Sequence, residues 1–177
     1  MNRYFAALLI TAMTSSLAFA QNQDAQTSPE FSGPKQDVTY HVVLLMESDD
    51  QNRRPYAGPA REGLAAAGYD RLVIAGSATA MVAIGERSAL TGNSRYGQLS
   101  VTSSMLNTTR ENEVQIEIKL HTGNQSPITI DTTARAPLGR WFLVGATESR
   151  SGIPKHITDG KRVVAVMRID DGVMTLD

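Results

Sequence analysis

The stretch EVQIEIKLHT, residues 113–122, is the clearest structural signal in the chain. Its apolar residues Val114, Ile116, Ile118 and Leu120 alternate with polar ones, so they occupy one face of an extended strand. A strand with one apolar and one polar face is typical of an antiparallel sheet that covers a core on one side and meets water on the other. The stretch therefore predicts an antiparallel β-sheet.

Further strands are predicted on both sides of this one, because short β-branched and apolar runs alternate with turn residues. A hairpin is expected between residues 113–122 and the strand that follows, and Asp170-Asp171-Gly172 favours a second hairpin turn. Thr91-Gly92-Asn93 is also expected to be a turn. The other expected strands are 38–46, 69–87 (one strand kinked at Gly76, or two), 96–106, 127–136, 141–149, 161–170 and 172–177.

One short helix is predicted at residues 59–68, PAREGLAAAG. Pro59 suits the first helical position and Gly68 suits the position just after the end, whereas Gly63 limits the helix to two or three turns. Many short strands and one helix predict a mainly β fold, an antiparallel β-sandwich or partial barrel with one short helix. We expect it to be a single β-rich domain spanning residues 37–177.

The first twenty residues, MNRYFAALLITAMTSSLAFA, have the features of a secretory signal peptide. Arg3 supplies the positive region, an apolar stretch follows, and Ala18-Phe19-Ala20 is a small-x-small cleavage site, so cleavage is expected after Ala20. A membrane anchor is the alternative, but the apolar run falls short of the ~20 residues that a spanning helix needs. We therefore expect no stable membrane span after cleavage. Residues 21–36, rich in Gln, Ser and Pro, are expected to form a disordered linker.

Composition narrows the location and the partners. The chain has no cysteine, so disulfides, thiolate metal sites and acylation at a lipoprotein cleavage site are excluded. An exported domain without disulfides must rely on its apolar core, which favours a bacterial periplasm, with outer-membrane association or secretion as alternatives. The formal net charge is -1 and no basic patch is present, so a nucleic-acid partner is not expected.

No catalytic arrangement stands out in the sequence. It contains no nucleophile elbow, zinc helix, P-loop or dinucleotide fingerprint. His41 and His121 lie on expected strands, where solvent-facing positions are favoured over a shared metal site. The acidic run ESDDQN at residues 47–52 lacks the spacing of a calcium loop. These observations predict a protein that is not an enzyme and uses neither a cofactor nor a metal.

The run WFLV at residues 141–144 contains the only tryptophan in the chain. By alternation, Trp141 and Leu143 face one way while Phe142 and Val144 face the other, so both faces are apolar. Such a strand is either buried on both sides or exposed to a partner. On this basis the candidate binding residues are Trp141, Phe142 and Tyr96, with core packing as the alternative for each of them.

Residues 113–149 carry a resemblance to a known family. An alternating strand (VQIEIKL) is followed by a Thr-rich strand (TTARAPLG) and a short apolar strand that reaches glycine (RWFLVGATES). This order resembles the end of the channel domain of bacterial secretins, the pores of secretion and pilus systems. The chain departs from the secretin pattern at Gly145-Ala146, where a Gly-Gly pair is expected, and it is far too short to be a secretin. The resemblance implies a secretin-like β-domain that serves as an accessory, and not a channel.

Three functional hypotheses follow. The leading one is an exported, periplasmic, non-enzymatic β-domain that binds an envelope or secretion-apparatus protein. The second is a carbohydrate or small-molecule binding module in which an exposed aromatic side chain is the anchor. The third is a periplasmic hydrolase with an unfamiliar site. The sequence leaves the identity of the partner and the oligomeric state open.

Overall fold

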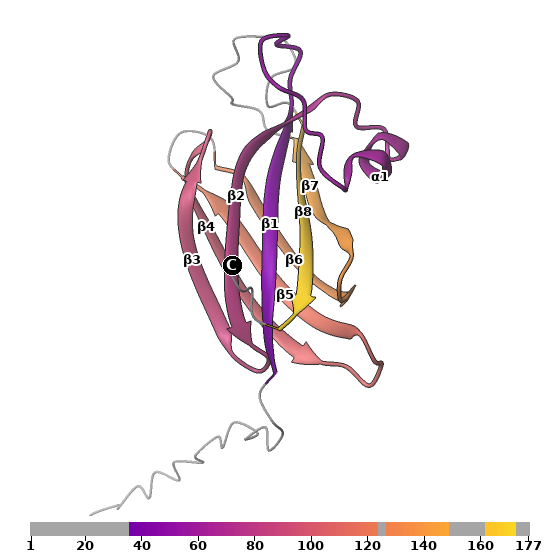
Figure 1. Ribbon diagram of the computed structural model, residues 1–177. Helices are drawn as coiled ribbons and strands as arrows, with labels where there is room; N and C mark the ends of the chain where they lie inside the picture. The colour runs from indigo at the N-terminus through magenta and orange to yellow at the C-terminus, as the bar shows by residue number, and fades with distance from the viewer. Residues whose placement is uncertain (1–35, 124–126, 149–161, 173–177) are drawn as a thin grey trace, which may run out of the picture. The chain divides into compact units, whose positions relative to one another are not determined.

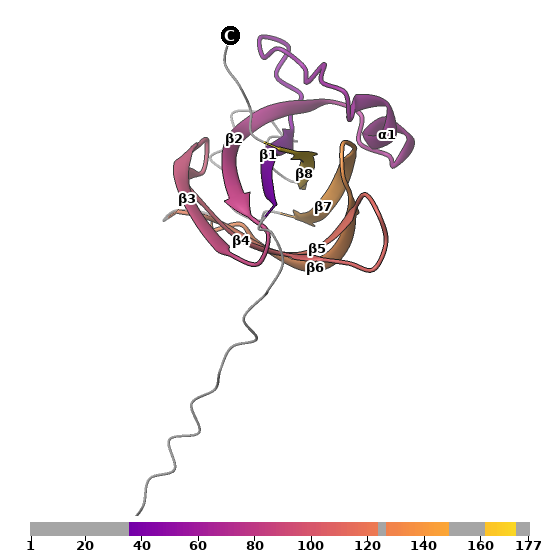
Figure 2. The same cartoon turned by 60° about the horizontal axis from the view of Figure 1, so that its bottom comes forward.

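Eight antiparallel strands form one sheet that curls into a nearly closed, barrel-like structure with one short helix outside it (Figures 1 and 2). The computed structural model describes residues 36–123, 127–148 and 162–172, all of which belong to one compact unit. The elements are β1 (Asp37–Glu47), α1 (Arg61–Ala66), β2 (Leu72–Ala83), β3 (Arg87–Ser94), β4 (Gly97–Asn107), β5 (Glu113–Thr122), β6 (Thr129–Pro137), β7 (Trp141–Glu148) and β8 (Arg162–Asp171). The predicted mainly β, antiparallel fold with one short helix is confirmed.

The sheet consists of two four-stranded halves. Strands follow the order β6-β5-β4-β3-β2-β1-β8-β7, and continuous ladders join the neighbours within β3–β6 and within β2-β1-β8-β7. The two halves meet through the single pair Gly76↔Ser94 between β2 and β3. On the other side of the sheet, side-chain contacts bring β6 close to β7. The fold therefore combines features of the two predicted forms, a sandwich and a partial barrel.

The core lies between the inner faces of the two halves. Along β5 the alternating residues Val114, Ile116, Ile118 and Leu120 are at most 1% exposed, as the alternation predicts. They pack with the inner residues of β1, β4 and β8, mostly valine, leucine, isoleucine and methionine. This apolar interior is the main source of stability for a chain without disulfides.

Strands β1 and β8 are buried on their outer faces as well. Val43, Leu45, Val164 and Val166 form a second apolar cluster there, which residues of the segment between β1 and β2 cover. We call this segment, residues 48–71, the excursion. Tyr56, Leu64 and, in part, Tyr69 close over the cluster. Because both faces are buried, β1 has the nearly continuous apolar sequence VVLLM at residues 42–46.

Hydrogen bonds hold the excursion together, and one of them, from Tyr56 to Leu72 of β2, fixes it to the sheet. The Ser48 N–H donates to the Arg71 carbonyl at 3.1 Å, and the Tyr56 N–H donates to the Leu72 carbonyl at 2.7 Å. The Arg71 guanidinium also donates to the carbonyls of Asp50 and Arg53, each at 3.0 Å. The predicted helix is confirmed within this segment, although α1 spans only six residues.

Two turn predictions near β3 have different outcomes. The expected turn at residues 91–93 is wrong, because these residues lie within β3. The chain reverses instead at Gly85, whose φ is +93°, and just before Gly97, whose φ is +94°. Both glycines adopt a left-handed conformation that other residues disfavour. The expected kink at Gly76 is confirmed, since β2 is one strand whose register with β1 shifts there.

Several predictions concern residues outside the described ranges. These are the signal peptide and cleavage site, nearly all of the linker, the middle of the β5–β6 connection at 124–126 and the terminal strand after Gly172. Gly172 itself has a φ of +86°, in agreement with the turn expected at that position. Within the described residues, no helix has the length and apolar character needed to span a membrane.

Candidate functional site: the interruption between β2 and β3

The ladder between β2 and β3 is interrupted over most of its length. The two strands are consecutive and antiparallel, yet among residues 76–94, all of which are described, only Gly76 and Ser94 form a ladder pair. By contrast, β3 and β4 are paired at every position of β3, from Arg87↔Ser104 to Ser94↔Gly97. We call the unpaired parts, residues 77–83 of β2 and 87–93 of β3, the β2–β3 interruption.

The two strands are joined at each end of the interruption, by a ladder pair at one end and by a tight turn at the other. At one end a Cβ on Gly76 would lie 2.9 Å from the Ser94 Cβ, so glycine is needed for this close pairing. The Arg95 N–H also donates to the Ala75 carbonyl at 2.8 Å there. At the other end the Glu86 N–H donates to the Ala83 carbonyl at 3.0 Å and forms the tight turn around Gly85. Between these ends the facing edges of two extended strands carry no ladder.

Mostly small side chains face inward along the interruption. Ala78, Ala80 and the larger Val82 lie on the inner face of β2. Ser88, the larger Leu90 and Gly92 lie on the inner face of β3. The three β3 residues remain partly exposed although they point toward the core. Inward residues of β5 are essentially buried, so solvent reaches the interior side of the sheet at β3 more than at β5.

A hydroxyl cluster lies beneath the interruption. Tyr40 of β1 is opposite Ala80 of β2, and its ring is fully buried. Its hydroxyl lies 3.0 Å from the Ser88 Oγ, which in turn lies 2.8 Å from the Ser103 Oγ of β4. Each hydroxyl can donate one hydrogen bond and accept others, so the cluster satisfies itself and keeps capacity at Ser88. The arrangement joins the two halves by hydrogen bonds where the ladder is missing.

The other corner of the sheet, between β6 and β7, is sealed differently. The Thr132 hydroxyl donates to the Val144 carbonyl at 2.9 Å, and Ile130 packs so closely on Gly145 that a Cβ there would lie 2.7 Å from its Cγ2. Val144 is the extra residue of a bulge in β7, and Pro137 ends β6. A bulge, a proline and a side-chain hydrogen bond are devices that protect strand edges. At the β2–β3 interruption, no proline lies on either edge.

The structure does not bring the three predicted binding residues together. Trp141 lies on the outer face of β7, half-buried against the outer apolar cluster. Phe142 faces inward and packs against the core, as does Tyr96, whose hydroxyl lies 3.3 Å from the Met46 sulfur. The predicted alternation of Trp141 and Leu143 against Phe142 and Val144 is confirmed, and Leu143 is 51% exposed.

Trp141 makes an edge contact with a histidine. The His41 and Trp141 rings have centroids 5.4 Å apart at an interplanar angle of 63°. Burial lowers the pKa of His41 below its usual value, and the nearby Asp170 carboxylate opposes this effect. The Arg168 guanidinium donates to the Asp170 carboxylate at 2.7 Å. Arg168 lies opposite His41 in the β1–β8 ladder and opposite Trp141 in the β7–β8 ladder. The Trp141 Nε1 is buried with no hydrogen-bond partner among the described residues.

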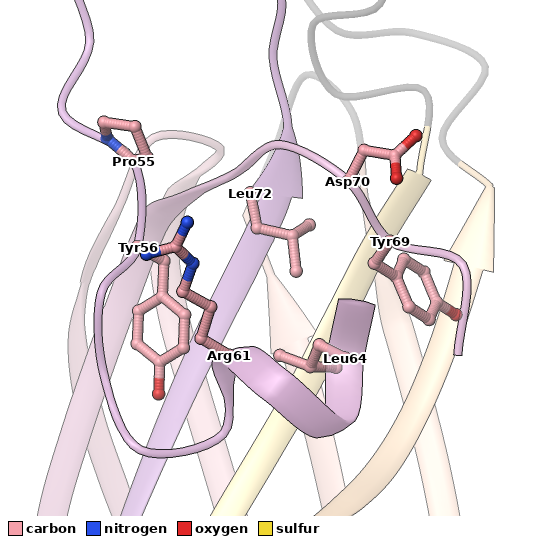
Figure 3. Close-up of a pocket in the computed structure, with 7 residues that line it drawn as sticks. All are labelled: Pro55, Tyr56, Arg61, Leu64, Tyr69, Asp70 and Leu72. Atoms are coloured by element: carbon pink, nitrogen blue, oxygen red, sulfur yellow. The ribbon is translucent and has the colours of Figure 1, made fainter. Parts of the chain in front are cut away.

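A small pocket lies between the excursion and the start of β2 (Figure 3). It encloses about 30 Å³, room for water but far less than the roughly 300 Å³ or more that drug-sized ligands occupy. Figure 3 shows Arg61 and Asp70 beside an apolar floor that includes Leu64 and Leu72. Next to it, the Arg162 guanidinium stacks 4.3 Å from the centre of the Tyr69 ring and donates to Glu47 at 3.0 Å.

The described residues hold no cluster of metal-ligating groups. No set of three or more His, Asp or Glu side chains gathers in a way that suits a metal ion within residues 36–123, 127–148 and 162–172. His41 on β1 and His121 on β5 lie on strands that are not neighbours. His121 is exposed and bonds to Thr129, 3.1 Å away. In the acidic run, Asp50 accepts from the Asn52 N–H and pairs with Arg53 at 3.2 Å, so it stabilises a turn.

Comparison with known proteins adds no family. No protein-family model matches the chain, and no curated protein matches it.

The sequence contains one indication of the β2–β3 interruption, which the search for alternating and apolar strands does not detect. Segments 77–80 (SATA) and 91–94 (TGNS) contain no large side chain, although both belong to strands that border a core. Strands with small residues pack poorly against a neighbour, and Gly in a strand often marks a close approach or an irregularity. The same small residues favour the turn that the sequence predicts, wrongly, at 91–93.

Proposed function

We propose that this chain is an exported, non-enzymatic β-domain of the periplasm that binds another protein of the cell envelope. The signal-peptide pattern at residues 1–20 supports export, and the absence of cysteine is compatible with a domain that relies on its core. The observation that carries protein binding is the β2–β3 interruption. Two long strand edges without a ladder are the type of surface on which polypeptides recognise each other through backbone hydrogen bonds.

An exposed apolar side chain supports the same site. Met81 lies on the outer face of β2 within the interruption and is 56% exposed. Leu106, at the end of β4, is 47% exposed but lies outside the interruption. These two residues form a matched pair, since both are large apolar side chains on outer strand faces.

The binding proposal is tested by co-purification from envelope extracts with a tagged mature chain. We expect Met81→Lys to lose a protein that the wild type retains, whereas Leu106→Lys keeps it. A partner lost only in Leu143→Lys would place the binding surface on β7, near Trp141. If the tagged wild type retains no protein above an untagged control, the binding proposal is wrong.

Export is tested by fractionation. We expect the tagged product in the periplasmic fraction, with Gln21 as its first residue. Full-length protein in the cytosol would contradict this part of the proposal. The secretin resemblance of residues 113–149 further suggests a partner in a secretion or pilus apparatus. The partner's identity in the co-purification tests that suggestion.

A second candidate function is the binding of a small polar ligand at the hydroxyl cluster. Ser88 favours it, because its hydroxyl is partly exposed and lies next to Tyr40 and Ser103. A saccharide that binds there raises the melting temperature of the wild type but not that of Ser88→Ala. A saccharide that stacks on Trp141 instead changes the tryptophan emission, and this change survives in Ser88→Ala.

A further inference from the structure

We infer that the partner enters as an extended polypeptide segment that adds as a new strand between β2 and β3. The inference rests on the proposed function and specifies the kind of partner surface that the site takes. It follows from the backbone of the interruption, from the side chains that face it and from the contrast with the β6–β7 corner.

Two strand edges face each other across the interruption. Residues 77–83 of β2 pair with β1 and residues 87–93 of β3 pair with β4, so each strand has one satisfied edge and one edge without a ladder. Neighbouring strands in a sheet lie about 4.8 Å apart, so the edges of β2 and β3 must separate to about 10 Å to admit a strand. A Cβ on Gly92 would lie 3.7 Å from the Ser77 carbonyl oxygen, so the edges are in contact at the Gly76 end and must open there. Only a third extended backbone can pair with both edges at once. A sugar or another small ligand lacks the matching row of donors and acceptors.

Small side chains line most of the inner face of the interruption. An inserted strand places every second side chain beneath the interruption, next to Ala78, Ala80, Leu90 and Gly92. Ala78, Ala80 and Gly92 present little or no side chain to the new strand, whereas Leu90 packs against the core. The hydroxyls of Tyr40 and Ser88 supply hydrogen-bonding capacity in the same place. A buried charge would be costly without a partner, so the inward residues of the segment are apolar or carry hydroxyl groups.

The same sheet seals its other corner, between β6 and β7. At β6–β7 the bulge at Val144, the proline at 137 and the Thr132 hydroxyl keep the edges from pairing with a foreign strand. At the interruption, both edges stay extended between the close pair at Gly76 and the turn at Gly85. A difference of this kind within one sheet identifies β2–β3 as the corner that accepts a strand.

The test is site-specific photo-cross-linking in cells that export the full chain. A benzoylphenylalanine residue replaces Met81 on β2, Ala89 on β3 or Leu143 on β7, and, as a matched control, Thr133 on the exposed outer face of β6. We expect an adduct with the partner protein from positions 81 and 89 and none from position 133. An adduct from position 133 or from position 143, with none from 81 and 89, overturns the strand inference but leaves the proposed function standing.

Two other outcomes are also decisive. If none of the four positions forms an adduct, protein binding itself fails together with the strand inference. If the adduct has twice the mass of this chain, the occupant is a second copy, and the inference of a partner strand is wrong.

A disulfide lock tests the insertion step itself. Residues 79 and 91 lie opposite each other when the register of Gly76↔Ser94 is extended along the hairpin. The chain has no other thiol, so the oxidised Thr79→Cys, Thr91→Cys variant holds one defined bond, which forms only while the two edges are close together. A disulfide holds the two Cα atoms within about 7 Å, too close for a strand between them. In the bonded fraction we expect the adduct from position 81 to be lost and to return on reduction.

The control for the lock is a disulfide in a complete ladder. Ser104→Cys with Glu117→Cys joins opposite residues of β4 and β5, and this pair is expected to leave the adduct unchanged in both redox states. An adduct that persists when the Thr79→Cys, Thr91→Cys variant is fully bonded overturns the inference, because the partner then binds without entering between the strands.

Discussion

The two halves of the sheet have similar inner faces but opposite outer faces. In the half formed by β3–β6, the outer residues of β5 are Gln115, Glu117 and Lys119, and they meet solvent. In the half formed by β2, β1, β8 and β7, the outer face carries Val43 and Leu45, and the excursion buries it over β1 and β8, while Met81 of β2 stays exposed. We call these the polar half and the covered half. The comparison shows that the outer face of a strand determines whether the fold must supply a second layer.

The halves also differ in how much stability each residue contributes. A residue of β1 or β8 mostly makes apolar contacts whether it points inward or outward. On β2 and in the polar half, outward residues mostly meet solvent. Burial of apolar side chains is the dominant favourable term in folding, so substitutions on the outer faces separate the two halves most clearly.

The largest expected effect is that of Leu45→Ala. Leu45 is fully buried between β1 and the excursion, so its truncation leaves a cavity between two layers. We expect the free energy of unfolding to fall by about 2–5 kcal/mol. The measurement is urea denaturation of the mature chain, followed by tryptophan fluorescence.

The control for Leu45→Ala is Gln115→Ala, which changes an outer residue of the polar half. Gln115 is exposed, so its substitution is expected to alter the free energy of unfolding by less than about 0.5 kcal/mol. If both variants unfold at the same urea concentration, the excursion contributes no packing energy and the distinction between the halves fails.

A second prediction concerns the sealed corner between the halves. Gly145→Ala places a Cβ against the Cγ2 of Ile130, which is branched and cannot turn away easily. We expect a loss of about 1–3 kcal/mol in the free energy of unfolding. Gly63→Ala, in α1, meets open space and is expected to be neutral or to stabilise the protein by up to about 1 kcal/mol. Equal effects of the two variants would show that β6 and β7 do not pack as described.

The sequence predicts most of the strands because alternation and apolar runs report directly on burial, but it misses β3, where a turn is expected instead. The alternating residues of 113–122 identify a half-exposed strand, and the apolar run at 42–46 identifies a buried one. The sequence cannot show what buries the outer face of that run. The covering residues Tyr56 and Leu64 belong to a polar segment and a short helix whose docking is a tertiary effect.

The candidate site is less predictable than the fold. Aromatic residues are the natural binding candidates, but Phe142 and Tyr96 contribute to the core instead. The β2–β3 interruption is a missing interaction between two strands, and residue patterns report what each strand buries but not whether its neighbour pairs with it. Gly92 favours a turn by its residue type, although the fold places it in the middle of β3.

A third, smaller effect is expected at the hydroxyl cluster that joins the halves. Tyr40→Phe removes one hydrogen bond to Ser88, while the Ser88–Ser103 bond remains. We expect a loss of about 0.5–1.5 kcal/mol in the free energy of unfolding. Ser104→Ala, on the outer face of β4, is the control and is expected to have a smaller effect. If Tyr40→Phe is neutral or stabilising, the hydroxyl cluster does not hold the halves together.

The smallest expected effect is a pH dependence confined to the covered half. Burial lowers the pKa of His41 below its usual 6.5, so the folded state binds fewer protons than the unfolded state as the pH falls below this value. Stability that is present above pH 6.5 is therefore lost on acidification, until the pH passes below the folded-state pKa. The groups that face His41 are Trp141 from β7, Arg168 and Asp170 from β8, and Thr79 from β2.

Glu47, at the end of β1, acts with the opposite sign. Burial raises its pKa above the usual 4.5, with a further contribution from Asp70 and an opposing one from Arg162, so its protonation at low pH favours the folded state. Comparing variants isolates the histidine from this background. In urea titrations between pH 5 and 8, we expect His41→Gln to lose part of the acid-dependent destabilisation, because the variant has no imidazole beside Trp141. A wild-type slope in His41→Gln would show that the contact with Trp141 leaves His41 as accessible to protons as in the unfolded chain.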